Sequence, residues 1–304
     1  MQVSVVIPTH NPRIDYLRRV LDALRLQQLP LVEWELLIVD NASQVAVASQ
    51  VDLAWHPAGR VIREERLGLT AARLAGFAAA RGEVVVLVDD DNVLAPDYLT
   101  AAAQIARDHP TLGAWSGNVE LVFEPGVTPP PVAWRSYLTE RVCRQAAVST
   151  DPGHNDSTPW GAGMCVRQSL AAAYRRRSLE NPDLHRLDLS GAQLVYGGDT
   201  DIAYFGCSLG MSKGVFPQLH VLHLIPPNRC ERAYLLRVIE GHAYSEWLHH
   251  WVLHKVVPRD DASPVRRLKR FVRLMLLSDA DTRAAARARA AGHARATREL
   301  AAKP

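Results

Sequence analysis

The chain has 304 residues, of which 48% are hydrophobic and 22% charged, close to the average of globular domains. This composition excludes a disordered, collagen-like or coiled-coil protein, and no stretch reaches the ~18 consecutive apolar residues of a membrane span. The net charge of +3 is uneven, because residues 255–304 hold 13 Lys/Arg against 5 Asp/Glu. The four cysteines are widely spaced without a C-x-x-C pair, so we expect reduced thiols in a cytoplasmic protein with no signal peptide.

The first third of the chain alternates between short apolar runs and segments with helical spacing. The runs predict buried strands and the other segments predict helices. In chain order these are strands at 3–7, 35–39, 60–62 and 83–88, and helices at 15–28, 69–81 and 97–108. Such alternation is typical of a parallel sheet flanked by helices, whose ligands bind beyond the carboxyl ends of the strands. Thr9, Asp40 and the acidic run Asp89–Asp91 follow strand ends in this way.

The pattern changes after about residue 113. We expect a strand at 119–123, a proline-rich loop at 125–131, a helix at 134–150, a strand at 220–225 and mainly helices from 228. The sequence contains neither G-x-G-x-x-G after the first strand nor a P-loop motif, which argues against the usual dinucleotide and P-loop sites. Histidines at 242, 249, 250 and 254 have helical spacing without companion acids, and we interpret them as a helical surface.

The acidic run places three carboxylates, those of Asp89, Asp90 and Asp91, directly after a buried strand. Clustered carboxylates repel one another, which raises their pKa values. Mg²⁺ or Mn²⁺, bound by carboxylates and by phosphate oxygens of a substrate, removes that repulsion. One acid would be enough to cap the following helix. Three acids therefore favour a metal site over a cap.

Three segments, in this order and spacing, resemble the family 2 glycosyltransferases of GT-A fold. They are residues 3–11 (VSVVIPTHN), 37–43 (LIVDNAS) and 87–92 (LVDDDN). With the segments below, the resemblance covers roughly residues 1–230. It implies an α/β protein of GT-A fold, with a Rossmann-like, mostly parallel sheet flanked by helices. We expect a nucleotide-sugar-binding half at 1–115, an acceptor-binding half at 116–227 and a helical C-terminal extension at 228–304.

The resemblance assigns the donor nucleotide-sugar to the strand ends. Thr9 and Asp40 match the family residues that hold the base and ribose, and the alternative for Asp40 is a turn cap with the next residue. Asp89 and Asp90 are expected beside the nucleotide-sugar, Asp89 nearer the ribose. Each carboxylate can accept from a ribose hydroxyl or a base N–H.

Residues 65–73 resemble the family's Asn-x-Gly-x-x-x-Ala-Arg-Asn segment. Arg73 falls on the Arg of that segment, which lies near the nucleotide in the family. Arg66 replaces the usual Asn and Leu74 replaces the second Asn. Arg66 is therefore either a phosphate or base contact or a solvated loop residue.

The family's Asp-x-Asp motif matches Asp89 and Asp91, and the resemblance makes Asp91 the direct ligand of Mg²⁺ or Mn²⁺. His223 lies where relatives place a His near the metal or diphosphate, with Arg229 as a phosphate partner. The alternative for His223 is a structural role on its strand. A metal at this place neutralises charge on the departing nucleoside diphosphate.

On the acceptor side, Trp160 and Gly161 resemble the family's acceptor loop, where Trp160 can stack on a sugar or instead fill a tight turn. Residues 196–202 resemble the segment that carries the general base, and Asp199 aligns with that base although Gly198 replaces a frequent Glu. Inversion requires a base on the acceptor side, opposite the leaving group. The alternative for Asp199 is a carboxylate that favours a helix N-terminus.

The sequence thus predicts an inverting glycosyltransferase that moves a sugar to a saccharide or lipid-linked acceptor in polysaccharide or glycolipid assembly. One alternative is a non-catalytic GT-A fold that binds sugar nucleotide or a partner protein. A metal-dependent phosphohydrolase is disfavoured because Val93 stands two residues after Asp91, where such enzymes need Thr. No nucleic-acid partner is expected.

Residues 264–277 predict a basic amphipathic helix. Such a helix can bind an anionic membrane surface, which would place the protein at the inner face of the membrane. The alternative is a helix that packs on the catalytic domain with a solvated basic face. The sequence leaves both interpretations open.

Overall fold

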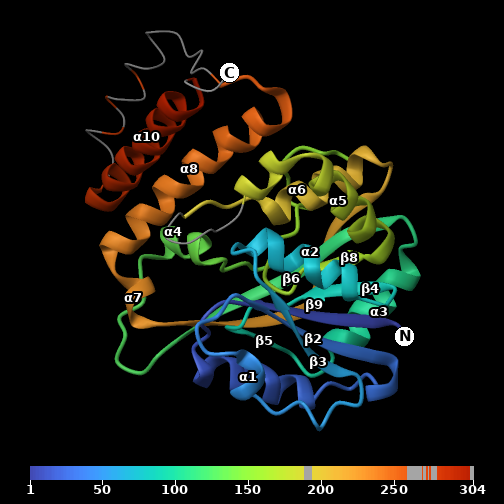
Figure 1. Cartoon of the computed structure of the whole chain (residues 1–304). Helices are drawn as coiled ribbons and strands as arrows, with labels where there is room; N and C mark the ends of the chain where they lie inside the picture. The colour runs from blue at the N-terminus through green and yellow to red at the C-terminus, as the bar shows by residue number, and fades with distance from the viewer. Residues whose placement is uncertain (188–193, 259–268, 270–271, 273, 275–278, 302–304) are drawn as a thin grey trace.

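The computed structural model describes residues 1–187, 194–258, 269, 272, 274 and 279–301 (Figure 1). Most of the predicted amphipathic segment 264–277 lies outside the described residues. Within the described ranges, no helix has both the length and the apolar character needed to cross a bilayer.

The strands predicted in the first third of the chain are confirmed, and they pair in parallel. β1 (Val3–Thr9) lies between β2 (Trp34–Asn41) and β4 (Val84–Leu87), and β2 also pairs with β3 (Gly59–Glu64). The register places Thr9 opposite Asp40. The carboxyl ends of these strands therefore meet at one edge of the sheet.

The other half of the sheet is mixed. The strand order is β3-β2-β1-β4-β8-β6-β9-β5, with β7 paired to β9. β8 is antiparallel to β4 and β6, whereas β6 and β9 are parallel. These strands are β5 (Asn92–Leu94), β6 (Leu112–Phe123), β7 (Ala147–Ser149), β8 (Cys165–Arg167) and β9 (Ser212–Ile225).

Helices cover both faces of the sheet (Figure 1), because its apolar strands alternate between two hydrophobic clusters. Along β1, Val5 and Ile7 belong to one cluster and Val6 to the other. The first cluster includes α1 (Ile14–Arg25) and α3 (Tyr98–Asp108). The second includes α2 (Leu69–Ala79), α5 (Gln168–Glu180) and α6 (Gly198–Ser208).

The helix predicted at 134–150 is wrong over most of its length. The segment begins with α4 (Val132–Arg135) and a 3₁₀ turn η3 (Ser136–Leu138), and Thr139 then adopts a left-handed conformation with φ of 70°. Beyond it, Arg141 forms a bridge to Val119, and β7 pairs with β9. Pairing with distant strands therefore outweighs the local helical spacing.

The residues that the structure describes after β9 are mainly helical, as predicted. They form α7 (Pro227–Cys230), α8 (Arg232–His254) and α10 (Ala280–Ala301), and α10 packs along α8 (Figure 1). Gly292 allows this close contact, because a Cβ there would lie 2.2 Å from the carbonyl oxygen of Glu240. Further 3₁₀ turns are η1 (Leu31–Glu33), η2 (Val47–Ser49) and η4 (Pro182–Leu187). The predicted division at 115/116 and 227/228 stays a prediction, and β6 and α7 run through these two points.

Candidate active site

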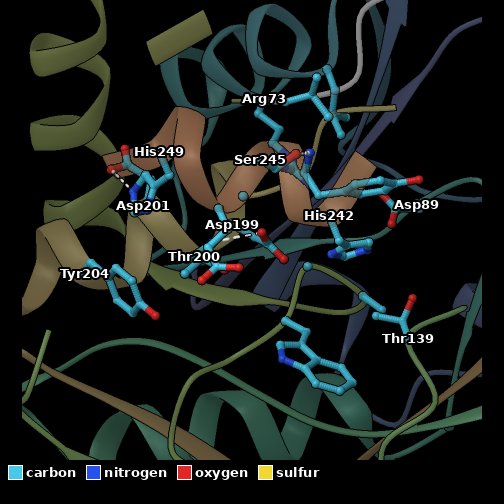
Figure 2. A pocket seen from close by; sticks show the side chains of 18 of the residues that line it. Arg73, Asp89, Thr139, Asp199, Thr200, Asp201, Tyr204, His242, Ser245 and His249 are labelled. Atoms are coloured by element: carbon cyan, nitrogen blue, oxygen red, sulfur yellow. Dashed lines mark hydrogen bonds and ion pairs between the residues drawn. The ribbon is translucent and has the colours of Figure 1, made fainter. Parts of the chain in front are cut away.

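A cavity of about 1550 Å³ opens beyond the carboxyl ends of β1 and β4. Thr9, the acidic run and Arg73 line one part of it, and Asp199 lines another together with residues of α8. Figure 2 shows Arg73, Asp89 and Asp199 projecting into this space from different elements. The site residues predicted from separate motifs are thus brought together in one cavity, apart from Asp40 and Arg66.

Asp91 is held by two basic side chains from β9 and α7. Its Oδ2 lies 2.9 Å from Nη1 of Arg229 and 3.4 Å from Nε2 of His223. The backbone explains the contact, because β5 pairs antiparallel with β9 and places Asn92 opposite His223. Burial acts to raise the pKa of Asp91, but the charges and hydrogen bonds of His223 and Arg229 hold it at about 2. Asp91 is therefore a carboxylate at neutral pH.

The other two acids of the run are less readily ionised. Burial raises the pKa of Asp89 to about 6, against the opposing charge of Arg73. Burial and the neighbouring Asp91 raise the pKa of Asp90 to about 7, although Asp90 accepts a hydrogen bond from the Thr9 hydroxyl. The run thus gathers more negative charge than its protein neighbours neutralise, as expected of a site that receives a cation.

Asp91 and His223 fit two ligand positions of a divalent cation. His223 Nδ1 lies 2.9 Å from the carbonyl oxygen of Leu138 and must donate to it, so in the neutral imidazole Nε2 is an acceptor, and it faces Nη1 of Arg229 at 3.3 Å. Adjacent ligands of an octahedral ion with ~2.1 Å bonds stand about 3 Å apart, close to the separation of the two side chains. Within the described residues, no group of three His, Cys, Asp or Glu side chains is arranged for a metal. The remaining ligands would have to be phosphate oxygens and water.

Asp199 lies in the first turn of α6 and lines the cavity. Its Oδ1 accepts from the backbone N–H of Thr200 at 2.8 Å, and the N-cap position of the helix is Gly197, which has no side chain to cap it. Asp199 therefore lies where a helix N-terminus favours a carboxylate, as in its alternative role, and its assignment as the general base stays a prediction. A Cβ at Gly161 would lie 3.1 Å from Oδ2 of Asp199 and 3.3 Å from Nη2 of Arg73. Gly161 thus leaves room for both side chains at this point of the cavity.

Trp160 also lines the cavity, and Arg141 covers part of its ring. The guanidinium carbon of Arg141 lies 4.7 Å from the ring centroid, and the backbone N–H of Trp160 donates to Ser116 Oγ at 3.1 Å. The indole is therefore held in place but not enclosed in the core. Its role in acceptor binding stays a prediction.

Two of the residues predicted to contact the donor nucleotide-sugar do not line the cavity. The buried carboxylate of Asp40 accepts from the backbone N–H groups of Ser43 and Val47, each at 3.0 Å, and from Arg63 at 2.9 Å. These contacts correspond to the turn-capping alternative for Asp40. Arg66 is exposed and pairs with Glu64 at 3.2 Å, as in its loop alternative. Nucleotide contacts by these two side chains stay predictions.

The histidines of α8 correct the interpretation of a helical surface. His242, His249, His250 and His254 all line the cavity, so this stripe of the helix is a wall of the site. His249 Nε2 donates to the carboxylate of Asp201 at 3.1 Å, and Asp201 also pairs with Arg177 at 2.8 Å. The sequence spacing indicates that these histidines share one stripe of the helix, whereas the contacts of α8 with residues 194–196 turn that stripe toward the cavity.

The sequence model of glycosyl transferase family 2 matches residues 4–180, more than half of the chain. The chain belongs to this family. Two similar proteins of Bacillus subtilis (strain 168), both named as glycosyltransferases, are EpsH and YwdF. EpsH is 33% identical over an alignment that covers 36% of this chain and 32% of EpsH. YwdF is 32% identical over an alignment that covers 34% of this chain and 38% of YwdF. These alignments thus cover less than half of the relatives.

The family 2 fold has a solved counterpart in TarS of Staphylococcus aureus. Its crystal structure in complex with UDP-GlcNAc superposes with a TM-score of 0.55 and 16% sequence identity, over 95% of this chain and 79% of that one. The likeness is one of fold. It confirms the predicted GT-A architecture of an α/β sheet flanked by helices.

Proposed function

We propose that the protein moves a sugar from a nucleotide-sugar to an acceptor hydroxyl, with inversion, during assembly of a polysaccharide or glycolipid. Membership of glycosyl transferase family 2 supports the reaction class. The observation that carries the proposal is that the acidic run and Asp199 line one cavity. The acidic run suits the binding of a diphosphate with its cation, and Asp199 suits the removal of a proton from an acceptor hydroxyl.

The donor nucleotide-sugar binds at the carboxyl ends of β1 and β4 in this proposal. Thr9, Asp89 and Arg73 line that part of the cavity, and Arg229 adds a cation beside Asp91. Guanidinium groups suit diphosphate oxygens because they offer several donors in one plane. TarS has been crystallised with UDP-GlcNAc, which makes this compound the first donor to test.

Asp199 acts as the general base in this proposal. An acceptor hydroxyl beside Asp199 gives up its proton to the carboxylate as its oxygen attacks the anomeric carbon, and the nucleoside diphosphate leaves from the opposite face. The absence of a side chain at Gly161 supports this arrangement, because it leaves room for both Asp199 and Arg73 at this part of the cavity. The acceptor is a saccharide, free or lipid-linked.

Asp91 and His223 would hold Mg²⁺ or Mn²⁺, which supplies positive charge to the leaving diphosphate when bound. Their separation of 3.4 Å and the low pKa of Asp91 support this assignment. Cytoplasmic location and membrane contact through 264–277 stay predictions.

Nucleoside diphosphate release tests the proposal. The wild type, given UDP-GlcNAc or the corresponding GDP- and dTDP-sugars with a mixed saccharide acceptor, is expected to release nucleoside diphosphate with Mn²⁺ and not with EDTA. Asp199→Asn should lower kcat at least ~10²-fold while donor binding stays the same. Asp22→Asn, on the exposed surface of α1, is the matched control. Equal turnover by Asp199→Asn and wild type would exclude Asp199 as the base, and donor binding without turnover would favour a non-catalytic protein.

A further inference from the structure

The cavity is larger than one substrate requires. Its volume of about 1550 Å³ exceeds the roughly 300–1,000 Å³ usual for small-molecule sites. The donor proposed above takes the part that lies at the ends of β1 and β4. The remaining part is walled by α8. This wall lies outside the part of the chain that the family model matches.

Three rings form an aromatic platform on this side of the cavity, namely Tyr137, Tyr196 and His242. The rings of Tyr196 and His242 are stacked, with centroids 4.1 Å apart and planes 7° from parallel. Tyr137 meets His242 edge-on at 5.4 Å and accepts a hydrogen bond from Arg289 of α10. Rings that line a cavity offer apolar faces with polar edges, a combination suited to the C–H faces and hydroxyls of a sugar.

The platform is fixed to the segment that carries the proposed base. Tyr196 lies two residues before the start of α6, and its backbone N–H donates to Ser245 Oγ on α8 at 2.9 Å. Gly241 lets α8 approach this segment, since a Cβ there would lie 2.3 Å from the carbonyl oxygen of Leu194. One turn further on, His249 and Arg177 both contact Asp201 of α6. Figure 2 shows His242, Ser245 and His249 beside Asp199 and Asp201. A ligand on the platform is thus held next to Asp199.

The charges on this wall nearly cancel. Burial lowers the pKa of His242 to about 4, and burial and the neighbouring histidines lower the pKa of His250. These imidazoles are therefore neutral at pH 7, and each offers one donor and one acceptor. Arg177 is paired with Asp201, and Arg289 lies 3.9 Å from Glu246. The wall suits hydroxyl groups better than it suits a phosphate or carboxylate.

We propose that the α8 wall is the acceptor subsite and that it binds the end of a neutral saccharide, packed against the aromatic platform of Tyr137, Tyr196 and His242 and hydrogen-bonded by His250 and His254. The rings of His250 and His254 lie 4.5 Å apart at the far end of the same wall. This subsite extends over several sugar units along α8. The assignment of acceptor binding rests on the function proposed above, whereas saccharide binding itself does not require turnover.

Binding of defined saccharides to the full chain tests the subsite. Cellotetraose and chitotetraose are the neutral probes and tetragalacturonate is the anionic probe, each followed by saturation-transfer NMR and titration at pH 7 with UDP and Mn²⁺ present. We expect binding of at least one neutral probe and weaker binding of tetragalacturonate. His242→Ala and Tyr196→Ala should weaken binding roughly tenfold or more, and Tyr196→Phe should retain it because the ring remains. His250→Ala, which changes an exposed side chain and keeps the platform, should weaken it by a smaller factor.

His220→Ala is the matched control, because His220 is exposed on β9 and does not line the cavity. It should bind the saccharide as the wild type does, and all variants should bind UDP equally. The subsite is overturned if no neutral probe binds, if only tetragalacturonate binds, or if the platform and His250 variants bind like the wild type. Loss of UDP binding in the wild type, with saccharide binding intact, would instead overturn the donor proposal and leave the subsite standing.

Discussion

Arg229 and Asp91 form an ion pair in which Nη1 lies 2.9 Å from Oδ2, within the acidic run that follows β4. This oxygen is also the one nearest His223. A divalent cation shared by Asp91 and His223 would meet the guanidinium at the same carboxylate oxygen. Arg229 therefore competes with the cation for Asp91 until a diphosphate offers the guanidinium another anion.

Replacing Arg229 should separate metal binding from nucleotide binding. In Arg229→Gln without nucleotide, Mn²⁺ should bind about tenfold more tightly, because a competing charge is removed from a partly desolvated site. UDP should bind more weakly, since a donor to phosphate is lost. Isothermal titration with Mn²⁺ and then UDP measures both effects. Arg232→Gln, an exposed variant on α8 that does not line the cavity, is the control. An unchanged Mn²⁺ affinity in Arg229→Gln would contradict the competition.

A methyl group at Gly161 should impair catalysis more than stability. The Cβ of Gly161→Ala would lie 3.1 Å from Asp199 and 3.3 Å from Arg73, so one of these side chains must shift. We expect kcat to fall roughly tenfold to a hundredfold, as for other small misplacements of reacting groups. Gly126→Ala gives the opposite result, since Gly126 has φ of 80° and no neighbour within 4 Å. It should lower Tm and leave kcat unchanged. Equal kcat for Gly161→Ala and wild type would show that the contact is not needed.

The ion pairs of Asp201 should make the protein less stable as the pH falls into the acid range. Burial raises the pKa of Asp201, but His249 and Arg177 outweigh it and hold the pKa below the ordinary value of 3.8. A depressed pKa contributes stability above 3.8 that is lost as pH falls through the folded-state pKa. At pH 7, Asp201→Asn should lose about 3 kcal/mol, the scale for removing one partner of a buried ion pair. The difference in the free energy of unfolding between Asp201→Asn and the wild type should be smaller at pH 3 than at pH 7. Urea unfolding at both pH values measures it, and a constant difference would contradict the ion pair.

Lys213 should hold one rim of the cavity in place. This fully buried side chain donates to the carbonyl oxygens of Asp151 and Gly153, on either side of Pro152, which lines the cavity. Lys213→Met keeps most of the volume and removes the donors, leaving two carbonyls without this partner. We expect faster hydrogen exchange at residues 151–155 and a raised acceptor KM with little change in donor KM. Unchanged exchange in this segment would show that other contacts hold the rim.

The parts of the fold that sequence predicts are those set by local patterns. Buried strands such as β1 are continuous apolar runs, and the acids that follow them must meet at one sheet edge because the strands are parallel. The helix expected at 134–150 failed because Arg141 and β7 pair with residues far away in the chain. Asp40 accepts from the backbone N–H groups of Ser43 and Val47, and the sequence pattern leaves both this turn-capping role and a nucleotide contact open. The inward direction of His242 depends on its packing against Tyr196 and Tyr137, which are far from it in the chain and which helical spacing does not reveal.

The pairing of β5 with β9 makes the candidate metal site sensitive to strand register. Asn92 stands opposite His223, and the backbone N–H of Leu224 donates to the carbonyl oxygen of Asp91. A slip of one residue would turn His223 to the opposite face of β9 and bring Leu222 or Leu224 beside the acids. A cation held by Asp91 and His223 would therefore bind one register and not its neighbours. Metal binding would then stabilise the sheet with the correct strand register during folding, in addition to any role in sugar transfer.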